Sequence, residues 1–389
     1  MAERGMIAAE PFRIDVSDAV LGDLSARLAL TRFPETEPAG AAWAAGVPRA
    51  YMRNVVAFWR DDYDWRHWEA RLNRFPQFRA PIAGGQVHFI REEGSGAAPF
   101  PLVLTHGWPG SFVEFIDLIE PLAHPERFGG DVADAFTVVV PSLPGYGFSD
   151  PPAAPILAAE VAARWRVLMG EVLGFRRYGA QGGDWGSAVT SWLALDAPPE
   201  LAAIHLNMVS LRPAMGEGTP PLDEDERRWL AASKARREGE LAYQQIQGTK
   251  PQTLAYGLTD SPAGLAAWIL EKFHGWTVPG QDMPPPFDLG HLVTNIMIYW
   301  LSGINAANWM YRSTVQGTSS ALKAGERVGV PTGVMLFPDD LAVPPPDRWI
   351  QRAYNLVHRT DAATGGHFAA MQCGAALVAD IRSFFRPYR

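Results

Sequence analysis

Short apolar runs that end in glycine- or proline-containing turns recur along this chain. Four of them read “FPLVLTHGWPGS” (100–111), “FTVVVPSLPGYGFSD” (136–150), “RYGAQGGDWG” (177–186) and “VPTGVMLFPDDL” (330–341). Apolar strands separated by helical spacing indicate a parallel sheet that is covered on both faces. Chemistry in such sheets lies where the carboxyl ends of the strands enter loops. We therefore expect HGWPG, GGDWG and FPDDL on one rim.

Helical patterns lie before and between these strands. The stretch 14–34 predicts a helix that Ser17 or Asp18 caps and whose apolar face includes Val20 and Leu24. A second helical pattern, “HLVTNIMIYWLSGINAANWMY”, belongs to a region that does not follow the strand rhythm. That region predicts a helical insertion above the rim.

The chain therefore divides into four expected segments, which together predict an α/β fold with a mostly parallel central sheet. They are an N-terminal extension (1–85), the first part of the α/β core (86–208), a helical cap (209–318) and the second part of the core (319–389).

The turn Gly182-Gly183-Asp184-Trp185-Gly186 has the pattern small–x–nucleophile–x–small. Such a turn holds one side chain exposed between a strand and a helix, and its small residues avoid clashes in the tight backbone. Serine normally occupies the central position, but here it is Asp184. Taken alone, the motif also fits an ordinary glycine turn in which Asp184 caps a helix.

Two downstream features favour the catalytic interpretation. In hydrolases of this fold the nucleophile is followed by an acid and then by a histidine. The FPDDL turn supplies Asp339 and Asp340, and “TGGHFAAM” places His367 in a glycine loop before an apolar helix. We predict that His367 is the base and that one of the two aspartates orients it.

The HGWPG loop predicts an oxyanion hole. A loop at a strand end can aim backbone N–H groups at developing negative charge. The amides of Trp108 and of Trp185, the residue after Asp184, form the expected pair, and His106 is expected to be structural.

An aspartate at this turn changes the chemistry. A serine that displaced a group from saturated carbon would leave an ether, which water does not readily cleave. A carboxylate leaves an ester, which water activated by His367 can hydrolyse. Asp184 therefore indicates substitution at sp³ carbon, with a halide or an epoxide oxygen as the leaving group.

The two leaving groups need different helpers. A halide needs only N–H donors, commonly from tryptophan, whereas an alkoxide needs a proton, for which a phenol is suited. The cap contains four tyrosines, and their spacing does not choose among them: Tyr243, Tyr256, Tyr299 and Tyr311.

Composition excludes several other classes of protein. The net charge of −8 argues against nucleic-acid binding. The single cysteine, Cys373, excludes an intrachain disulfide and a cysteine zinc site. The chain has no HExxH, clustered Cys/His or GxGxxG pattern, so we expect neither a metal nor a cofactor. It also shows neither a signal-peptide pattern nor a membrane-spanning run, so we expect a cytoplasmic protein.

Several long motifs resemble the microsomal-type epoxide hydrolases, in which an N-terminal extension precedes an α/β-hydrolase core. They include “LTHGWPGSFVEF”, “PSLPGYGFSD”, “QGGDWGS”, “GGHFAA” and the distinctive cap block “IQGTKPQTLAYGLTDSPAGLAAWILEKF”. The resemblance spans nearly the whole chain. It implies a cofactor-independent enzyme that converts a hydrophobic epoxide and water to a vicinal diol.

The resemblance also assigns roles residue by residue. It implies that Asp184 is the nucleophile, His367 the base and Asp340, two places after the proline of its turn, the orienting acid. Tyr243, just before “QQIQGTKPQT”, and Tyr311 in “NWMYRS” correspond to the pair that assists ring opening.

This chain departs from the family pattern in two respects, and two other functions remain open. Membrane-bound relatives carry an N-terminal anchor, which we do not expect here, and the orienting acid is Asp rather than Glu. The other functions are a haloalkane dehalogenase of the same fold and a binder of apolar ligands without turnover. The sequence does not indicate whether the chain forms a homodimer.

Overall fold

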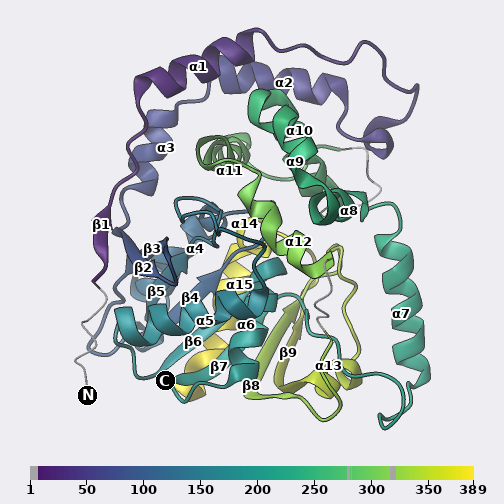
Figure 1. The fold of residues 1–389 in the computed structure, drawn as a ribbon. Coiled ribbons are helices and arrows are strands. Elements are labelled where there is room, and N and C mark those ends of the chain that lie inside the picture. Colours follow the sequence, from purple (N-terminus) through teal and green to yellow (C-terminus); the bar gives the residue numbers. More distant parts are fainter. Residues whose placement is uncertain (1–7, 278–280, 282, 316–320) are drawn as a thin grey trace.

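The computed structural model describes residues 8–277, 281, 283–315 and 321–389 (Figure 1). Within these residues nine strands form one sheet in the order β1-β2-β3-β5-β4-β6-β7-β8-β9. The strands are β1 (Glu10–Phe12), β2 (Gln77–Ile82), β3 (Gly85–Glu92), β4 (Phe100–Thr105), β5 (Phe136–Pro141), β6 (Tyr178–Gly182), β7 (Leu201–Leu206), β8 (Val328–Leu336) and β9 (Tyr354–Asp361).

The sheet is mostly parallel, as the sequence predicts. The ladders from β5 through β4, β6, β7 and β8 to β9 are parallel, and those joining β1, β2, β3 and β5 are antiparallel. All of β5 and all of β6 are buried, which explains why these strands have no alternating polar face. The α/β-hydrolase fold expected from the sequence is confirmed.

Helices that connect the strands cover this sheet. The α4 and α15 helices pack together, and α5 packs with α6. The helices of the core are α4 (Ile116–Ala123), α5 (Ala158–Val167), α6 (Asp184–Asp196), α13 (Asp347–Ala353), α14 (Ala369–Gln372) and α15 (Gly374–Phe385).

Most of the helices inserted between β7 and β8 lie above the sheet, whereas the first of them runs beside it (Figure 1). These helices are α7 (Glu224–Arg237), α8 (Ala242–Thr249), α9 (Pro251–Asp260), α10 (Pro262–Gly275), α11 (Leu289–Ser302) and α12 (Trp309–Val315). The expected end of the cap at residue 318 lies outside the described residues.

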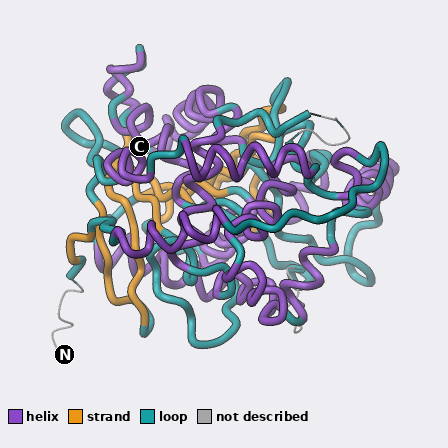
Figure 2. The backbone as a smooth tube through the Cα atoms, turned by 90° about the horizontal axis from the view of Figure 1, so that it is seen from above, coloured by secondary structure: helices purple, strands orange, loops and turns teal. Residues whose placement is uncertain are grey.

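The N-terminal segment belongs partly to the sheet and partly to the region above it. It supplies β1, β2 and the helices α1 (Asp18–Ala29), α2 (Arg49–Asp61) and α3 (Trp65–Leu72). The α1 and α2 helices contact α10 of the cap, and Figure 1 shows them crossing above it. Seen from above, helices lie in front of most of the sheet, and strands are visible on the side of the N-terminus (Figure 2). The expected boundary at residue 85 falls where β3 begins.

Two local expectations for α1 differ from the structure. Ser17 occupies the N-cap position, but neither its side chain nor another makes a capping hydrogen bond there. Leu24 is buried as expected, whereas Val20 is 41% exposed because only part of the apolar face meets neighbouring helices. Within the described part of the chain, we find no helix with the length and apolar character required to cross a bilayer.

Candidate active site

Asp184 lies on a strained turn between β6 and α6. Its φ of +49° is in the left-handed region, which a non-glycine residue adopts at a cost of about 1–3 kcal/mol. Glycines make this turn feasible. A Cβ on Gly186 would lie 1.8 Å from the carbonyl oxygen of Thr105, and one on Gly182 would lie 2.2 Å from that of Gly186. The close approach of α6 to β4 therefore requires the flanking glycines that mark this motif.

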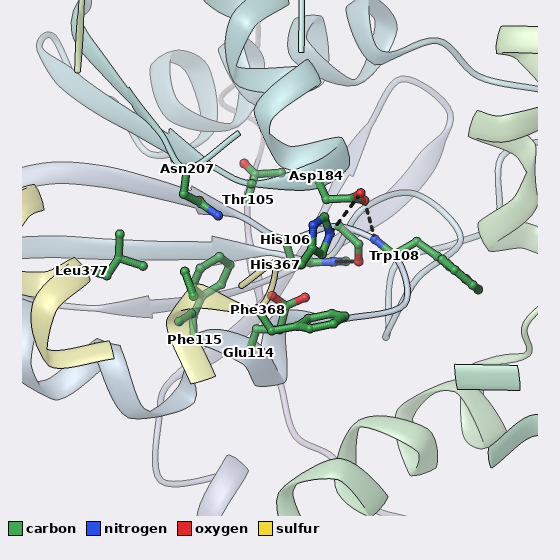
Figure 3. Close-up of a pocket in the computed structure, with 14 residues that line it drawn as sticks. Thr105, His106, Trp108, Glu114, Phe115, Asp184, Asn207, His367, Phe368 and Leu377 are labelled. Atoms are coloured by element: carbon green, nitrogen blue, oxygen red, sulfur yellow. Dashed lines mark hydrogen bonds and ion pairs between the residues drawn. The ribbon is translucent and has the colours of Figure 1, made fainter. Parts of the chain in front are cut away.

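The structure brings His367 and Asp340 to Asp184. His367 Nε2 lies 3.3 Å from Asp184 Oδ2 (Figure 3). His367 Nδ1 lies 2.8 Å from Asp340 Oδ1. Asp340 follows β8 and is 2% exposed, and Ala342 N–H also donates to its Oδ1. Asp339 is half-buried, and its backbone N–H donates to Gly365 O. Of the two aspartates in the FPDDL turn, Asp340 therefore contacts the histidine.

The loop that carries His367 is fixed by a cap residue that the sequence analysis did not single out. His367 N–H donates to Trp276 O at 3.0 Å, and the two rings lie 4.8 Å apart between centroids. A Cβ on Gly366 would lie 2.4 Å from the same Trp276 oxygen. Gly366 therefore permits the hydrogen bond between His367 of the core and Trp276 of the cap. No sequence motif around Trp276 indicates this hydrogen bond.

The charge state of His367 depends on its two carboxylate neighbours. Burial alone would lower the pKa of the imidazole, but Asp340 and Asp184 outweigh burial and raise that pKa to about 10. The resting site therefore contains a protonated His367 between two carboxylates. Loss of negative charge from Asp184 would remove part of the stabilisation that keeps this proton bound.

This ion pair predicts a pH-dependent stability. Because the pKa of folded His367 is about 10 and its ordinary value is 6.5, the folded protein binds the extra proton between these values. The resulting stabilisation is complete below pH 6.5 and is lost as the pH rises to about 10. We expect the thermal unfolding midpoint to fall less over this interval in His367→Gln than in the wild type. Equal falls in both proteins would contradict the assignment.

A backbone amide of the HGWPG loop faces the Asp184 carboxylate. Trp108 N–H donates to Asp184 Oδ1 at 2.8 Å (Figure 3). The Trp185 amide belongs to the first turn of α6, where N–H groups have no intrahelical acceptor. The HGWPG loop is held by α11, since Asn295 Nδ2 donates to Pro109 O and Tyr299 OH donates to Gly110 O. The loop is thus fixed before substrate binds.

His106 lies beside this loop and acts as part of its support. Its Nε2 accepts from Leu143 N–H, and its Nδ1 donates to Gly107 O. Burial lowers the pKa of its imidazole to about 4, so the ring is neutral near pH 7. These contacts fit the structural role that we expect for His106.

The four cap tyrosines occupy different environments. Tyr243 on α8 and Tyr311 on α12 are 6% and 2% exposed, and their rings lie edge to face with centroids 5.8 Å apart. Tyr243 stacks on Trp108, with ring centroids 4.8 Å apart, and Tyr311 lies edge-on to the same ring. Tyr256 is 73% exposed, and Tyr299 is engaged with the HGWPG loop. The structure therefore brings Tyr243 and Tyr311 to the rim.

Both phenols remain protonated at neutral pH. Burial raises the pKa of Tyr243, and the charge of Asp184 raises it further. The same two causes, together with Tyr243, raise the pKa of Tyr311. The pair can therefore donate hydrogen bonds or a proton to an oxygen bound near Asp184.

A small cavity of about 20 Å³ lies beside Asp184 and His367, and Tyr243 and Tyr311 are not part of its lining. Figure 3 shows its lining, which includes Asp184, His367, Trp108, Phe368 and Glu114. Among the described residues, no group of three or more His, Cys, Asp or Glu side chains could hold a metal ion. The chemistry available here is covalent catalysis by a carboxylate with acid–base assistance.

Family comparisons agree with this architecture. Residues 101–253 match the model of the alpha/beta hydrolase fold, and residues 9–115 match the model described as epoxide hydrolase N terminus. The chain is 40% identical to an assigned epoxide hydrolase of Stigmatella aurantiaca, over 97% of this chain and 85% of the relative. It is 33% identical to epoxide hydrolase 1 of Sus scrofa, over 96% of this chain and 88% of that protein.

Solved structures share the whole fold. The Aspergillus niger epoxide hydrolase superposes with a TM-score of 0.85 at 32% identity and covers 99% of this chain and 97% of its own. The juvenile hormone epoxide hydrolase of the silkworm Bombyx mori gives a TM-score of 0.83 at 30% identity, with 98% and 94% covered. Sheet, cap and aspartate turn define this chain as an α/β-hydrolase enzyme. It belongs to the epoxide hydrolase family.

Proposed function

We propose that this epoxide hydrolase converts a hydrophobic epoxide to a vicinal diol through an ester on Asp184. Asp184 Oδ1 is held by Trp108 N–H, and Oδ2, which lies 3.3 Å from His367 Nε2, attacks a ring carbon. The ring C–O bond breaks, and the ring oxygen takes a proton from the Tyr243–Tyr311 pair. The products of this step are a hydroxyalkyl ester and a phenolate.

The second half of the reaction hydrolyses the ester. The pKa of His367 falls once Asp184 has lost its charge. Protonated His367 therefore loses its proton, and the phenolate is protonated again. Neutral His367 then takes a proton from water as the water oxygen attacks Asp184 Cγ. The amides of Trp108 and Trp185 stabilise the oxyanion. When the tetrahedral intermediate collapses, the diol oxygen leaves and takes the proton that His367 removed from water. The new carboxylic acid of Asp184 then protonates His367, which restores the resting state.

The observation that carries this proposal is the pair of buried phenols, Tyr243 and Tyr311, whose ring centroids lie 5.8 Å apart next to Trp108. An alkoxide leaving group needs a proton donor that remains protonated at neutral pH, and both phenols satisfy that condition. The apolar surroundings, with Trp108 stacked on Tyr243, favour a hydrophobic substrate.

A direct test compares two substrates. The purified protein is incubated with styrene oxide and, separately, with a 1-bromoalkane, and diol and bromide are quantified. Diol without bromide is the expected result. If no member of a panel of aromatic and long aliphatic epoxides is converted to a diol, the proposal is rejected.

Dehalogenation is the second candidate, and one observation favours it. The buried indole N–H groups of Trp108 and Trp185 have no hydrogen-bond acceptor among the described residues. Indole donors of this kind suit a departing halide. Bromide release that survives removal of both tyrosine hydroxyls would support this second activity.

The two neighbouring aspartates give a matched pair of variants. Asp340→Asn should lower kcat by about 10⁴-fold, because an amide that donates to His367 Nδ1 imposes the wrong tautomer. Asp339→Asn should leave kcat within about threefold, since its side chain is not the one that contacts His367. Similar losses in both variants would show that the turn, rather than the Asp340 carboxylate, is responsible.

A further inference from the structure

Glu114 is a carboxyl group in the pocket that the steps above do not use. It lies on a short 3₁₀ segment (Phe112–Phe115) that follows the HGWPG loop, and it lines the same pocket as Asp184 and His367. Figure 3 shows its carboxyl group turned toward the His367 side of the pocket. A third acid at the reacting centre requires an explanation, because burying a carboxyl group is unfavourable.

The backbone of the loop reserves space for this carboxyl group. A Cβ on Gly110 would lie 1.3 Å from Glu114 Oε1, so any side chain at position 110 would displace the acid. The two ring nitrogens of His367 contact Asp184 and Asp340, which leaves Glu114 as a separate group across the pocket. The space between Glu114 and the Asp184–His367 pair therefore belongs to the pocket itself.

Glu114 is electrically coupled to both reacting groups. Burial raises the pKa of its carboxyl group to about 8, with His367 and the Gly107 backbone opposing the increase and Asp184 adding to it. Near pH 7 the group is therefore largely a neutral acid, with one oxygen that accepts and one hydroxyl that donates. A neutral carboxyl group can hold a water molecule without competing with His367 for its proton.

We propose that Glu114 positions the water molecule that hydrolyses the Asp184 ester. One hydrogen of this water is bound by His367 Nε2 and is transferred to it, and the other is held by the carbonyl oxygen of Glu114. The water oxygen is thereby directed at Asp184 Cγ, and Glu114 itself neither gains nor loses a proton. This role rests on the ester mechanism proposed above and adds a water-positioning residue to it.

Support of the oxyanion loop is the alternative role, and the loop has other supports. Asn295 and Tyr299 hold the carbonyl oxygens of Pro109 and Gly110 from α11. Ser111 Oγ accepts from Val113 N–H and donates to Asn295 Oδ1. Removal of the Glu114 carboxyl group should therefore leave Trp108 N–H in place, and with it the formation of the ester.

The test separates the two halves of the reaction with styrene oxide as the probe. Stopped samples are analysed by intact mass to give the rates of ester formation and ester decay. In Glu114→Leu, ester decay should slow by about 10- to 100-fold, with ester formation within about threefold of wild type. Because the ester then accumulates, kcat and KM should fall together. Glu120→Gln serves as the control, because Glu120 is a half-buried glutamate of α4 that pairs with Arg74 and does not line the pocket.

Glu114→Gln distinguishes positioning from packing. The amide accepts and donates like the neutral acid, so decay of the ester should be within about fivefold of wild type. If the Leu variant does not fold, the Gln variant is compared with Glu114→Ala. Unchanged ester decay in the Leu and Ala variants, or equal slowing of formation and decay, would overturn the role of Glu114. A wild-type enzyme that turns over without any ester on Asp184 would instead reject the underlying mechanism.

Discussion

The His367→Gln variant is expected to stop after the first half of the reaction and to accumulate an ester on Asp184. Glutamine cannot take a proton from water, whereas attack by Asp184 requires no base. Turnover to diol should fall by about 10⁴-fold or more, because loss of the base in a catalytic triad has effects of this size. Intact mass should show an increase equal to one epoxide molecule, and peptide mapping should locate it at Asp184.

The matched control combines this change with removal of the nucleophile. The His367→Gln/Asp184→Ala protein should show no added mass after the same incubation. An adduct that persists in the double variant would place the covalent bond on another residue. A His367→Gln protein that forms diol at the wild-type rate would remove His367 from the mechanism.

Loss of both phenol hydroxyls is expected to have the second-largest effect, this time on ester formation. In Tyr243→Phe/Tyr311→Phe the ring oxygen would leave as an unassisted alkoxide, so ester formation should slow by about 10²- to 10⁴-fold. Each single variant should retain part of the rate, since the two phenols lie together and either can reach the oxygen. Rapid-quench measurement of the ester is the relevant assay.

Tyr256→Phe is the control for this pair, because Tyr256 lies in the same cap but is 73% exposed. Its rate of ester formation should match that of the wild type. If the double variant forms ester normally but hydrolyses it slowly, the phenols act in the second half of the reaction, and the source of the ring-opening proton must be sought elsewhere.

The local pattern of apolar residues and turns was sufficient to predict the architecture of the sheet. Apolar strands that lead into glycine turns predict the parallel sheet, and the same turns predict that Asp184, the FPDDL aspartates and the HGWPG loop share one rim. The prediction succeeds because parallel strands place their carboxyl ends at the same edge. It was less accurate at the N-terminal helix, where Val20 is exposed although the helical period places it with Leu24. Burial of a helix face depends on which neighbouring elements pack against it, and the helical period of apolar residues does not specify those neighbours.

Spacing along the chain did not choose among equivalent residues; the family resemblance implied a choice, and spatial proximity agrees with it. Asp339 and Asp340 are adjacent in the chain, but only the side chain of Asp340 contacts His367. Spacing along the cap did not separate the four tyrosines, whereas their burial and hydrogen bonds do. Glu114 lies in the motif LTHGWPGSFVEF but was given no role, and Trp276 lies in no quoted motif. A local pattern shows neither that Glu114 lines the pocket nor that Trp276 O accepts from His367 N–H.

The sequence by itself determined the fold, the family and the residue types that carry covalent chemistry at saturated carbon. These follow from strand and helix periods, from glycines at a strained turn and from an aspartate where serine is usual. Spacing alone left open the choice between Asp339 and Asp340 and among the cap tyrosines, and the family resemblance implied Asp340, Tyr243 and Tyr311. The tertiary structure shows that these side chains contact His367 and Trp108, and it alone places the Glu114 carboxyl group in the pocket. Each of these depends on contacts between segments far apart in the chain, and local sequence patterns do not encode such distances.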